Sequence, residues 1–221
     1  MSSIALYVEV PFATFRESHR REYDKTYPVP PPSTVYGMLL SLVGETDAYK
    51  HCGVQLAIAM LSQPRKSKVL RQLRRFKVKD YSDSRNRIPE YQEILTDIKF
   101  ITWVASGAEQ VQPTLSQRVE QALMYPTSVQ RFGCLYLGES NDLVNVVKLI
   151  SNDYRSESRR WLIRDDEGLM TLPYWVDHVG SRGTRWRRYR LQEIATESPP
   201  ESCWTTIQSP IFASICEWGE D

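Results

Sequence analysis

Residues 26–44 carry the sequence TYPVPPPSTVYGMLLSLVG, in which four prolines within five residues precede a compact apolar run that ends at a glycine. Proline restricts φ to roughly −65° and has no amide donor, so residues 28–32 predict a stiff, extended lead-in. We expect residues 34–43 to form a short buried helix, with Ser33 or Thr34 as its N-cap and Gly44 as its stop.

Apolar patterns on both sides of this segment predict the rest of a compact domain. Residues 4–12 alternate with a period of two, which is typical of a half-buried strand that we expect to leave the sheet at Pro11. Further strands are predicted at 54–61, 98–104 and 133–138, and a second helix at 115–124. The order strand, helix, strand, strand, helix, strand is that of the ferredoxin-like β-α-β-β-α-β arrangement, so the predicted fold class is α+β.

A protruding β-hairpin is predicted before the third of these strands. Residues 70–79 and 91–104 read as two arms joined by the turn-prone sequence DYSDSRNR at residues 80–87. We expect this hairpin, over residues 65–95, to be inserted in a main domain of residues 1–150.

The last third of the chain predicts a smaller β-rich region. A short helix over residues 141–150 is expected to lead into residues 151–221. Strand candidates in that region are 161–164, 169–176, 185–191 and 204–209.

Basic residues are concentrated in two segments, although the formal net charge is only +1. Residues 64–87 contain ten basic residues and two acids, and residues 182–190 contain five arginines and no acid. Residues 193–221 contain six acids and neither Lys nor Arg. Arginine matches phosphate oxygens with its planar fork and stacks on bases, so we expect a nucleic-acid partner. A solvated ribbon face remains the alternative.

Length and composition exclude several classes of protein. The 221 residues are 41% hydrophobic and 25% charged, which is ordinary for a globular protein and unlike collagenous, coiled-coil or long disordered chains. No apolar run approaches the roughly 20 residues that span a bilayer, so we expect a cytoplasmic protein with no membrane partner. Four cysteines without a CxxC pair and three histidines predict no metal site and no cofactor.

Three stretches, in this order, resemble a known family. They are PFATFR (11–16) followed by residues 26–44, then RIPEYQE (87–93), then RFGCLYLGES (131–140). Together they resemble the fifth family of CRISPR-associated proteins, in the RAMP superfamily, and the form of the first stretch is nearer to type I-B and myxobacterial-type relatives. The resemblance is specific over residues 4–44, moderate to about residue 150 and weak beyond it.

The resemblance implies a non-catalytic, RNA-binding subunit of a type I Cascade surveillance complex in antiviral defence. Such a subunit caps the 5′ handle of the crRNA and anchors the Cascade backbone subunit and the large subunit. Contact with target DNA near the protospacer-adjacent motif stays open. The predicted hairpin would correspond to the family's thumb, which wedges between guide nucleotides, with Phe76 and Tyr81 as candidate wedges.

The candidate RNA-binding residues supply positive charge, a helix start or flat aromatic faces, which suit phosphates and unstacked bases. They are Arg16, His19, Arg20, Arg21, Tyr27, Ser33, Thr34 and Tyr36 near the N-terminus, Arg74, Arg75, Lys77, Arg85 and Arg87 in the hairpin, and Arg131. For Tyr36, one turn into an apolar helix, a core role is the alternative.

Two other functions remain open. An endoribonuclease that processes precursor crRNA is one, because the type I-C branch of the family cuts RNA with Tyr, Lys and His. The branch's Lys-His pair near the thumb has no counterpart among His19, His51 and His178, so we expect no catalysis. A stand-alone single-stranded nucleic-acid-binding protein is the other. The arginines of residues 182–190, interleaved with aromatics, fit a second nucleic-acid face and a surface strand equally well.

Overall fold

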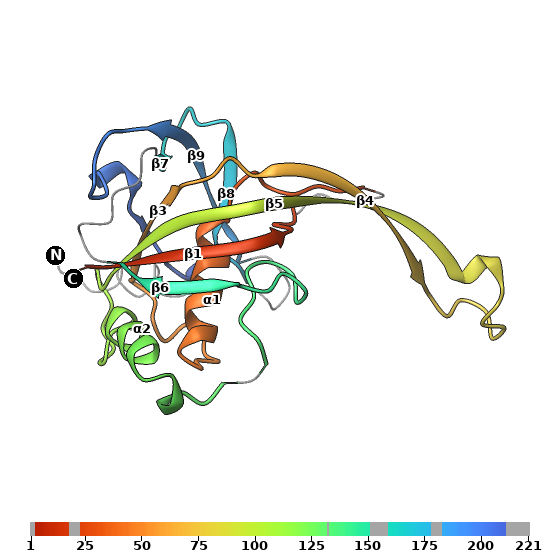
Figure 1. Ribbon diagram of the computed structural model, residues 1–221, viewed down its shortest axis with the longest axis horizontal. Helices are drawn as coiled ribbons and strands as arrows, with labels where there is room; N and C mark the ends of the chain where they lie inside the picture. The colour runs from red at the N-terminus through yellow and green to blue at the C-terminus, as the bar shows by residue number, and fades with distance from the viewer. Residues whose placement is uncertain (1–2, 18–22, 132, 151–158, 178–182, 211–221) are drawn as a thin grey trace, which may run out of the picture.

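The computed structural model describes residues 3–17, 23–131, 133–150, 159–177 and 183–210. Across these ranges the strands form one sheet, with two α-helices beside it and a hairpin that extends far from the body (Figure 1). None of the helices in these ranges is long and apolar enough to cross a membrane. The elements are β1 (Ser3–Ala13), β2 (Tyr23–Asp24), α1 (Pro32–Leu42), β3 (Gln55–Met60), β4 (Arg65–Arg74), β5 (Arg87–Ala105), α2 (Leu115–Met124), β6 (Val146–Leu149), β7 (Arg160–Arg164), β8 (Met170–Trp175), β9 (Arg185–Glu193) and β10 (Thr205–Thr206).

The body of the sheet follows the order β6-β1-β5-β3-β7-β9-β8, and its two faces bury different cores. Leu6, Val8 and Val10 alternate along β1 and are fully buried with α1 and α2 on one face. On the other face Trp103 and Trp161 stack with ring centroids 4.8 Å apart. The period-two expectation is therefore confirmed for residues 4–10, whereas Phe12 is 45% exposed.

Helix α1 begins at Pro32, two residues before the predicted start. Its N-cap is Pro31, with φ −61°, and no side chain caps the helix, so the expectation that Ser33 or Thr34 would do so is wrong. The proline run already sets the backbone for the first turn, which makes a side-chain cap unnecessary. Gly44 ends the helix as expected, with φ +67° in the left-handed region.

β1 continues past Pro11 to Ala13, so the predicted exit from the sheet at Pro11 is wrong. On one side β1 pairs with β6 only from Leu6 to Glu9, while on the other it pairs with β5 as far as Ala13. Pro11 lies beyond the β6 ladder, where its missing amide breaks no hydrogen bond to that strand.

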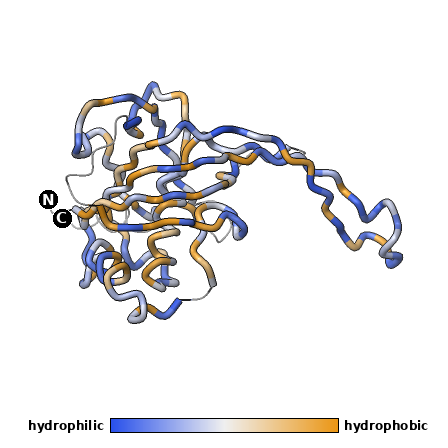
Figure 2. The backbone as a smooth tube through the Cα atoms, viewed as in Figure 1, coloured by the Kyte–Doolittle hydropathy of each residue, from blue (hydrophilic) through white to orange (hydrophobic). Residues whose placement is uncertain are grey.

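The predicted hairpin is present, but its first arm is β4 and not residues 70–79, of which 75–79 form no strand. β4 pairs with the first part of β5, in register from Arg65↔Thr96 to Arg74↔Arg87. β5 is 19 residues long and runs from this hairpin into the centre of the sheet. Near Asp97, which has φ +60°, β5 passes from pairing with β4 to pairing with β3. The hairpin is rich in polar residues along its length, in contrast to the strands of the body (Figure 2).

Two predicted elements between residues 133 and 150 are wrong. Residues 133–138 form no strand, because Gly133 and Gly138 have φ +70° and +113° and turn the backbone; a single bridge joins Tyr136 to Leu143. The expected helix over 141–150 is instead a loop followed by β6, which pairs with the free side of β1. Two adjacent valines begin β6 and favour this extended form.

The C-terminal strands continue the same sheet. β7 pairs with β3 and β9, and β8 forms the far edge, where it contacts α1 (Figure 1). The first three strand candidates of this region are confirmed, and the fourth reduces to the two residues of β10. Pro173 is tolerated in β8 because edge strands can lack an amide donor on one side.

Candidate nucleic-acid interface

The β4–β5 register sorts the hairpin side chains into two faces. We define the cationic face by alternate residues of β4 and their cross-strand partners: Lys66, Lys68, Leu70, Gln72 and Arg74, with Leu95, Glu93, Tyr91, Pro89 and Arg87. The opposite face carries Val69, Arg71 and Leu73. Four positive charges therefore project from one side of the hairpin stem.

Cations on the cationic face differ in their partners. Near the root, Lys66 Nζ lies 2.8 Å from Glu93 Oε2, and Lys68 Nζ lies 5.4 Å from the centre of the Tyr23 ring. Toward the tip, Arg74 and Arg87 lie directly opposite one another, and neither has a carboxylate partner among the described residues. Like charges directly opposite are destabilising, so this pair favours a bound anion.

Between the two groups of cations, Leu70 and Tyr91 form a cross-strand pair that is 59% and 50% exposed. An apolar pair at this position buries little against the protein itself. A flat ring between positive charges is the arrangement that holds an unstacked base of single-stranded RNA.

The tip of the hairpin is organised by Asn86, whose side chain is buried. Asn86 Oδ1 accepts hydrogen bonds from the amides of Lys77 and Val78, and its Nδ2 donates to the carbonyls of Val78 and Asp80. These contacts fix the tip without using the charged ends of Arg75 and Lys77, which stay exposed.

Side chains of the tip have two kinds of surroundings. Arg85 forms an ion pair with Asp83, Nη2 to Oδ2 at 2.6 Å, so its charge is locally balanced. Phe76 is 80% exposed and lies 5.8 Å from Tyr81, and Arg74 lies over the Tyr81 ring at 4.4 Å. The tip thus presents two aromatic rings beside an arginine.

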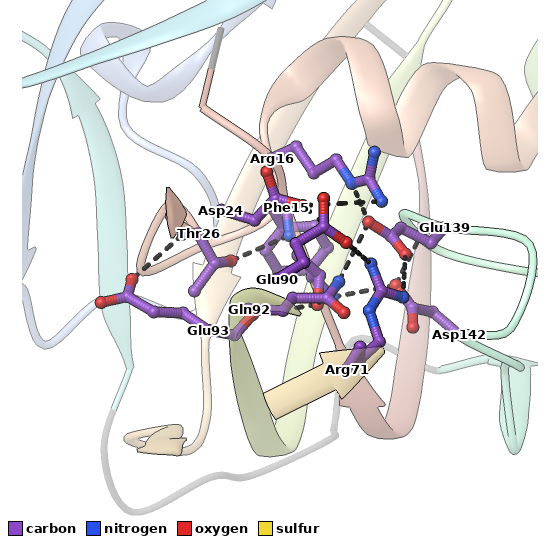
Figure 3. Close-up of polar contacts among 11 residues, drawn as sticks. Phe15, Arg16, Asp24, Thr26, Arg71, Glu90, Gln92, Glu93, Glu139 and Asp142 are labelled. Atoms are coloured by element: carbon purple, nitrogen blue, oxygen red, sulfur yellow. Dashed lines mark hydrogen bonds and ion pairs between the residues drawn. The ribbon is translucent and has the colours of Figure 1, made fainter. Parts of the chain in front are cut away.

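At the root of the hairpin, carboxylates surround Arg16 and Arg71 (Figure 3). Arg16 Nε bonds to Glu139, and Arg71 lies 3.1 Å from Glu90 and 3.7 Å from another oxygen of Glu139. Asp24 lies 3.9 Å from Arg16 and 4.0 Å from Arg71. Arg16, predicted to contact RNA, is therefore engaged by carboxylates that join the N-terminal segment, the hairpin and the loop after Gly138.

Asp142 holds the backbone of two segments that carry this network. Its Oδ2 accepts hydrogen bonds from the amides of Thr14 and Glu139, both at 2.8 Å. Burial raises the pKa of Asp142 to about 6, although the hydrogen bond from Thr14 and the charge of Arg16 oppose the rise. Gln92 adds a hydrogen bond to Glu139 at 3.1 Å. The hairpin root is thus held by a polar network rather than by an apolar core.

A second feature is a cleft of about 600 Å³ beside α1, lined by Ser33, Tyr36, Gly37, Arg131 and Trp175 among others. It brings together three predicted residues from distant parts of the sequence. Ser33 Oγ donates to the carbonyl of Pro173 at 2.9 Å, and Arg131 is exposed at the wall.

Tyr36 is 4% exposed, and its hydroxyl donates to the carbonyl of Ala48 at 2.7 Å. Burial raises the pKa of Tyr36 above its usual value. The structure therefore favours the core role for Tyr36 over base stacking.

The remaining predicted residues fall in three places. His19, Arg20 and Arg21 lie outside the described residues. Tyr27 is partly buried and packs against the main core, and Thr34 is partly buried in the first turn of α1. Of the hairpin candidates, Arg74, Arg75, Lys77, Arg85 and Arg87 are all exposed.

Four residues on the same face as Arg74 were not predicted from the sequence: Lys66, Lys68, Leu70 and Tyr91. The period-two alternation before the turn at 80–87 contains this set of residues. It assigns them to one face only when the cross-strand register is known. The carboxylate partners of Arg16 and Arg71 had no local signal, since Glu139 lies 123 residues from Arg16.

Comparisons with known proteins agree on one family. A protein-family model described as "CRISPR-associated protein (Cas_Cas5)" matches residues 3–135. The chain is 40% identical over 195 residues to "CRISPR-associated protein Cas5" of Myxococcus xanthus (strain DK1622), which covers 86% of this chain and 91% of that protein.

Solved structures share the fold at low sequence identity. A chain of a structure described as "CRISPR RNA-guided surveillance complex" superposes with a TM-score of 0.62 at 16% identity, over 91% of this chain and 96% of that one. A structure described as "Crystal structure of Cas protein" gives a TM-score of 0.53 at 15% identity, over 90% of this chain and 100% of that one. From the family match and the identity to the Myxococcus protein, the chain belongs to the Cas5 family of CRISPR-associated proteins.

Proposed function

We propose that this protein is the subunit of a type I Cascade complex that binds the crRNA and caps its 5′ handle. The observation that carries the proposal is the exposed pair Arg74 and Arg87, which face each other across the hairpin without a carboxylate partner in the described residues. A phosphate between them would relieve the repulsion, and the neighbouring Arg75 and Lys77 extend the positive surface to the tip.

The fold detail that we propose is a ferredoxin-like domain with the hairpin as the family's thumb. Support comes from the strand order β6-β1-β5-β3, which places the fourth, first, third and second strands of the β-α-β-β-α-β series side by side. The hairpin leaves the body between β3 and the central part of β5 and projects free of it (Figure 1). A free projection suits insertion between an RNA strand and a neighbouring subunit.

Partners follow from the same proposal. The guide RNA 5′ handle would lie along the cationic face, and the exposed rings of Phe76 and Tyr81 at the tip would meet the Cascade backbone subunit. The large subunit would bind the body. A similar structure is described as an RNA-guided surveillance complex, which supports assembly of this kind, and a cytoplasmic location would follow from it.

We propose no catalytic role. His51 is fully buried, with Nδ1 bonded to Glu109 and Nε2 2.7 Å from Arg118 Nη1. Because a guanidinium only donates, Nε2 accepts from Arg118, and Nδ1 is engaged by Glu109. Neither nitrogen is free to reach an RNA hydroxyl, which disfavours the endoribonuclease alternative for this histidine.

The proposal is tested by co-expressing the tagged chain with its neighbouring Cascade proteins and a guide array, and sequencing the RNA that copurifies. Short RNAs with one shared 5′ end, together with a repeated backbone protein, are expected. A His51→Ala variant should give the same 5′ ends. Recovery of the protein alone, or with RNAs of random ends, would support a stand-alone binding protein instead.

A further inference from the structure

Strand β9 carries a row of exposed side chains that have no role in the RNA binding proposed for the hairpin. Its sequence RWRRYRLQE contains four arginines and, before Glu193, no acid. Tyr189 and Leu191 lie on the side of the main core, so the alternate residues Trp186, Arg188 and Arg190 lie on the opposite side. We refer to these three residues as the β9 row.

Charge on the β9 row is only partly balanced. Arg190 Nε lies 3.3 Å from Asp165 Oδ2, and the Arg190 side chain is 56% exposed. Arg188 Nη1 donates to the backbone carbonyl of Asp166 at 2.9 Å, which orients the guanidinium without neutralising it. Both groups keep donors for a further acceptor.

An exposed ring extends the row. Trp186 is 38% exposed, lies beside Pro173 across the strand pair, and precedes Arg188 by two residues. Successive members of the row are therefore about 6.8 Å apart along the strand. The exposed part of the Trp186 ring, beside two arginines, forms a stacking platform flanked by phosphate-binding groups.

We propose that the β9 row binds single-stranded nucleic acid, with one base stacked on Trp186 and backbone phosphates bound by Arg188 and Arg190. The site is separate from the hairpin, because β3 and β7 lie between β5 and β9 in the sheet. It therefore serves a segment of nucleic acid other than the one on the cationic face, and it does not depend on the guide-capping proposal. An acidic protein surface would match the arginines but would make no use of the ring.

The test measures fluorescence anisotropy of labelled 12-nucleotide strands, one RNA and one DNA, with the full-length chain over a range of salt concentrations. All variants carry Arg74→Gln, Arg75→Gln and Lys77→Gln, so that hairpin binding is weakened equally. Arg188→Gln with Arg190→Gln should lower the affinity at least fivefold and reduce the salt slope by about 1.4, from roughly 0.7 for each phosphate contact. The RNA and DNA arms show which strand the site prefers.

Two single variants sharpen the test. Trp186→Ala should lower the affinity about fivefold while Trp186→Phe retains most of it, because a phenyl ring still offers a face on which a base can stack and a methyl group does not. Asp165→Asn should raise the affinity two- to threefold, because it releases Arg190. A structural role for Asp165 would instead lower affinity and stability together.

Arg185→Gln is the matched control. Arg185 is exposed on the same strand, but it is the cross-strand neighbour of Trp175 and does not belong to the β9 row. It should leave affinity and salt slope unchanged. The proposal is overturned if the Arg188/Arg190 double variant binds like its parent, or if Arg185→Gln causes the same loss. It is also overturned if the β9 variants lose a protein subunit of the purified complex while strand binding is intact.

Discussion

Arg71 and Arg74 are three positions apart on β4 but lie on opposite faces of the hairpin. Arg71 is surrounded by Glu90, Glu139 and Asp24. Arg74 lies over the Tyr81 ring, faces Arg87 and has no ion pair with a described residue. Counting basic residues along the sequence does not distinguish Arg71 from Arg74. Their surroundings give one a role in holding the hairpin root and the other a free charge for a ligand.

The difference predicts opposite effects of replacing each arginine by alanine. Arg71→Ala should lower the free energy of unfolding by about 1–2 kcal/mol, because it removes the ion pair with Glu90 and leaves Arg16 alone to compensate Glu139 and Asp24. Arg74→Ala should change it by less than about 0.5 kcal/mol and weaken RNA binding. Urea unfolding and RNA binding measured on both variants check this. Equal destabilisation by the two would contradict the assignment of roles.

Asp142 makes stability depend on pH in a stated direction. Its pKa is about 6 in the folded protein, above its ordinary 3.8, so the unfolded chain loses the proton first as pH rises. Stability should therefore fall between about pH 4 and 6, by up to about 2–3 kcal/mol, and then level off. Asp142→Asn should remove this fall, as measured by urea unfolding at pH 4.5, 5.5 and 6.5.

Glu45 titrates with the opposite sign, at the acid end of that window. Burial alone would raise its pKa, but hydrogen bonds from Lys50 and Arg118 outweigh burial and lower the pKa to about 2. Its contribution is lost only below about pH 4.5. An unchanged pH profile in Asp142→Asn would show that the carboxyl is not protonated in the folded protein near pH 5.

At the scale of elements, the hairpin was predictable because its signals are local. The turn sequence at 80–87 and the flanking arms suffice to place it. The strand β6 was not predictable from residues 141–150, because that segment becomes a strand by pairing with the open side of β1. Propensity is weak there, and tertiary pairing decides the structure.

The basic residues near the tip of the hairpin make a prediction at this scale. Replacing Arg74, Arg75 and Lys77 together by Glu should abolish assembly on guide RNA, because it reverses the charge of the tip. The same three residues replaced by Gln should give an intermediate loss, with a salt slope lower by about 2. Purification of the complex with quantified RNA, alongside filter binding, measures both. Assembly at wild-type levels in the Glu variant would remove the hairpin from the RNA-binding account.

At the scale of the whole molecule, the hairpin and the body are separable. No contact of the described residues ties the segment 75–86 to the body, so a shortened hairpin should fold. Replacing residues 75–86 by Asn-Gly, which favours a two-residue turn, should shift Tm by less than about 2 °C and abolish assembly. Thermal melting and complex purification check the two halves of this prediction. A large loss of Tm would show that the tip stabilises the body.

The division of the chain also belongs to this scale. The predicted order of elements separated residues 1–150 from 151–221, but β7 pairs with β3, and β8 contacts α1, so the last strands extend the first sheet. The sequence carries no sign of this pairing, because strand order is set by contacts between residues about 100 positions apart. The pattern of residues 4–44, in contrast, predicted both the first strand and the first helix.

The central claim is that the hairpin holds the 5′ end of a guide RNA. The most direct measurement places 4-thiouridine in the 5′ handle of a guide assembled into the complex, crosslinks it with light, and maps the crosslinked peptides. We expect crosslinks to residues 64–91, concentrated at Tyr91 and around Arg74. Crosslinks confined to other subunits, or to this protein only from the 3′ part of the guide, would contradict the account.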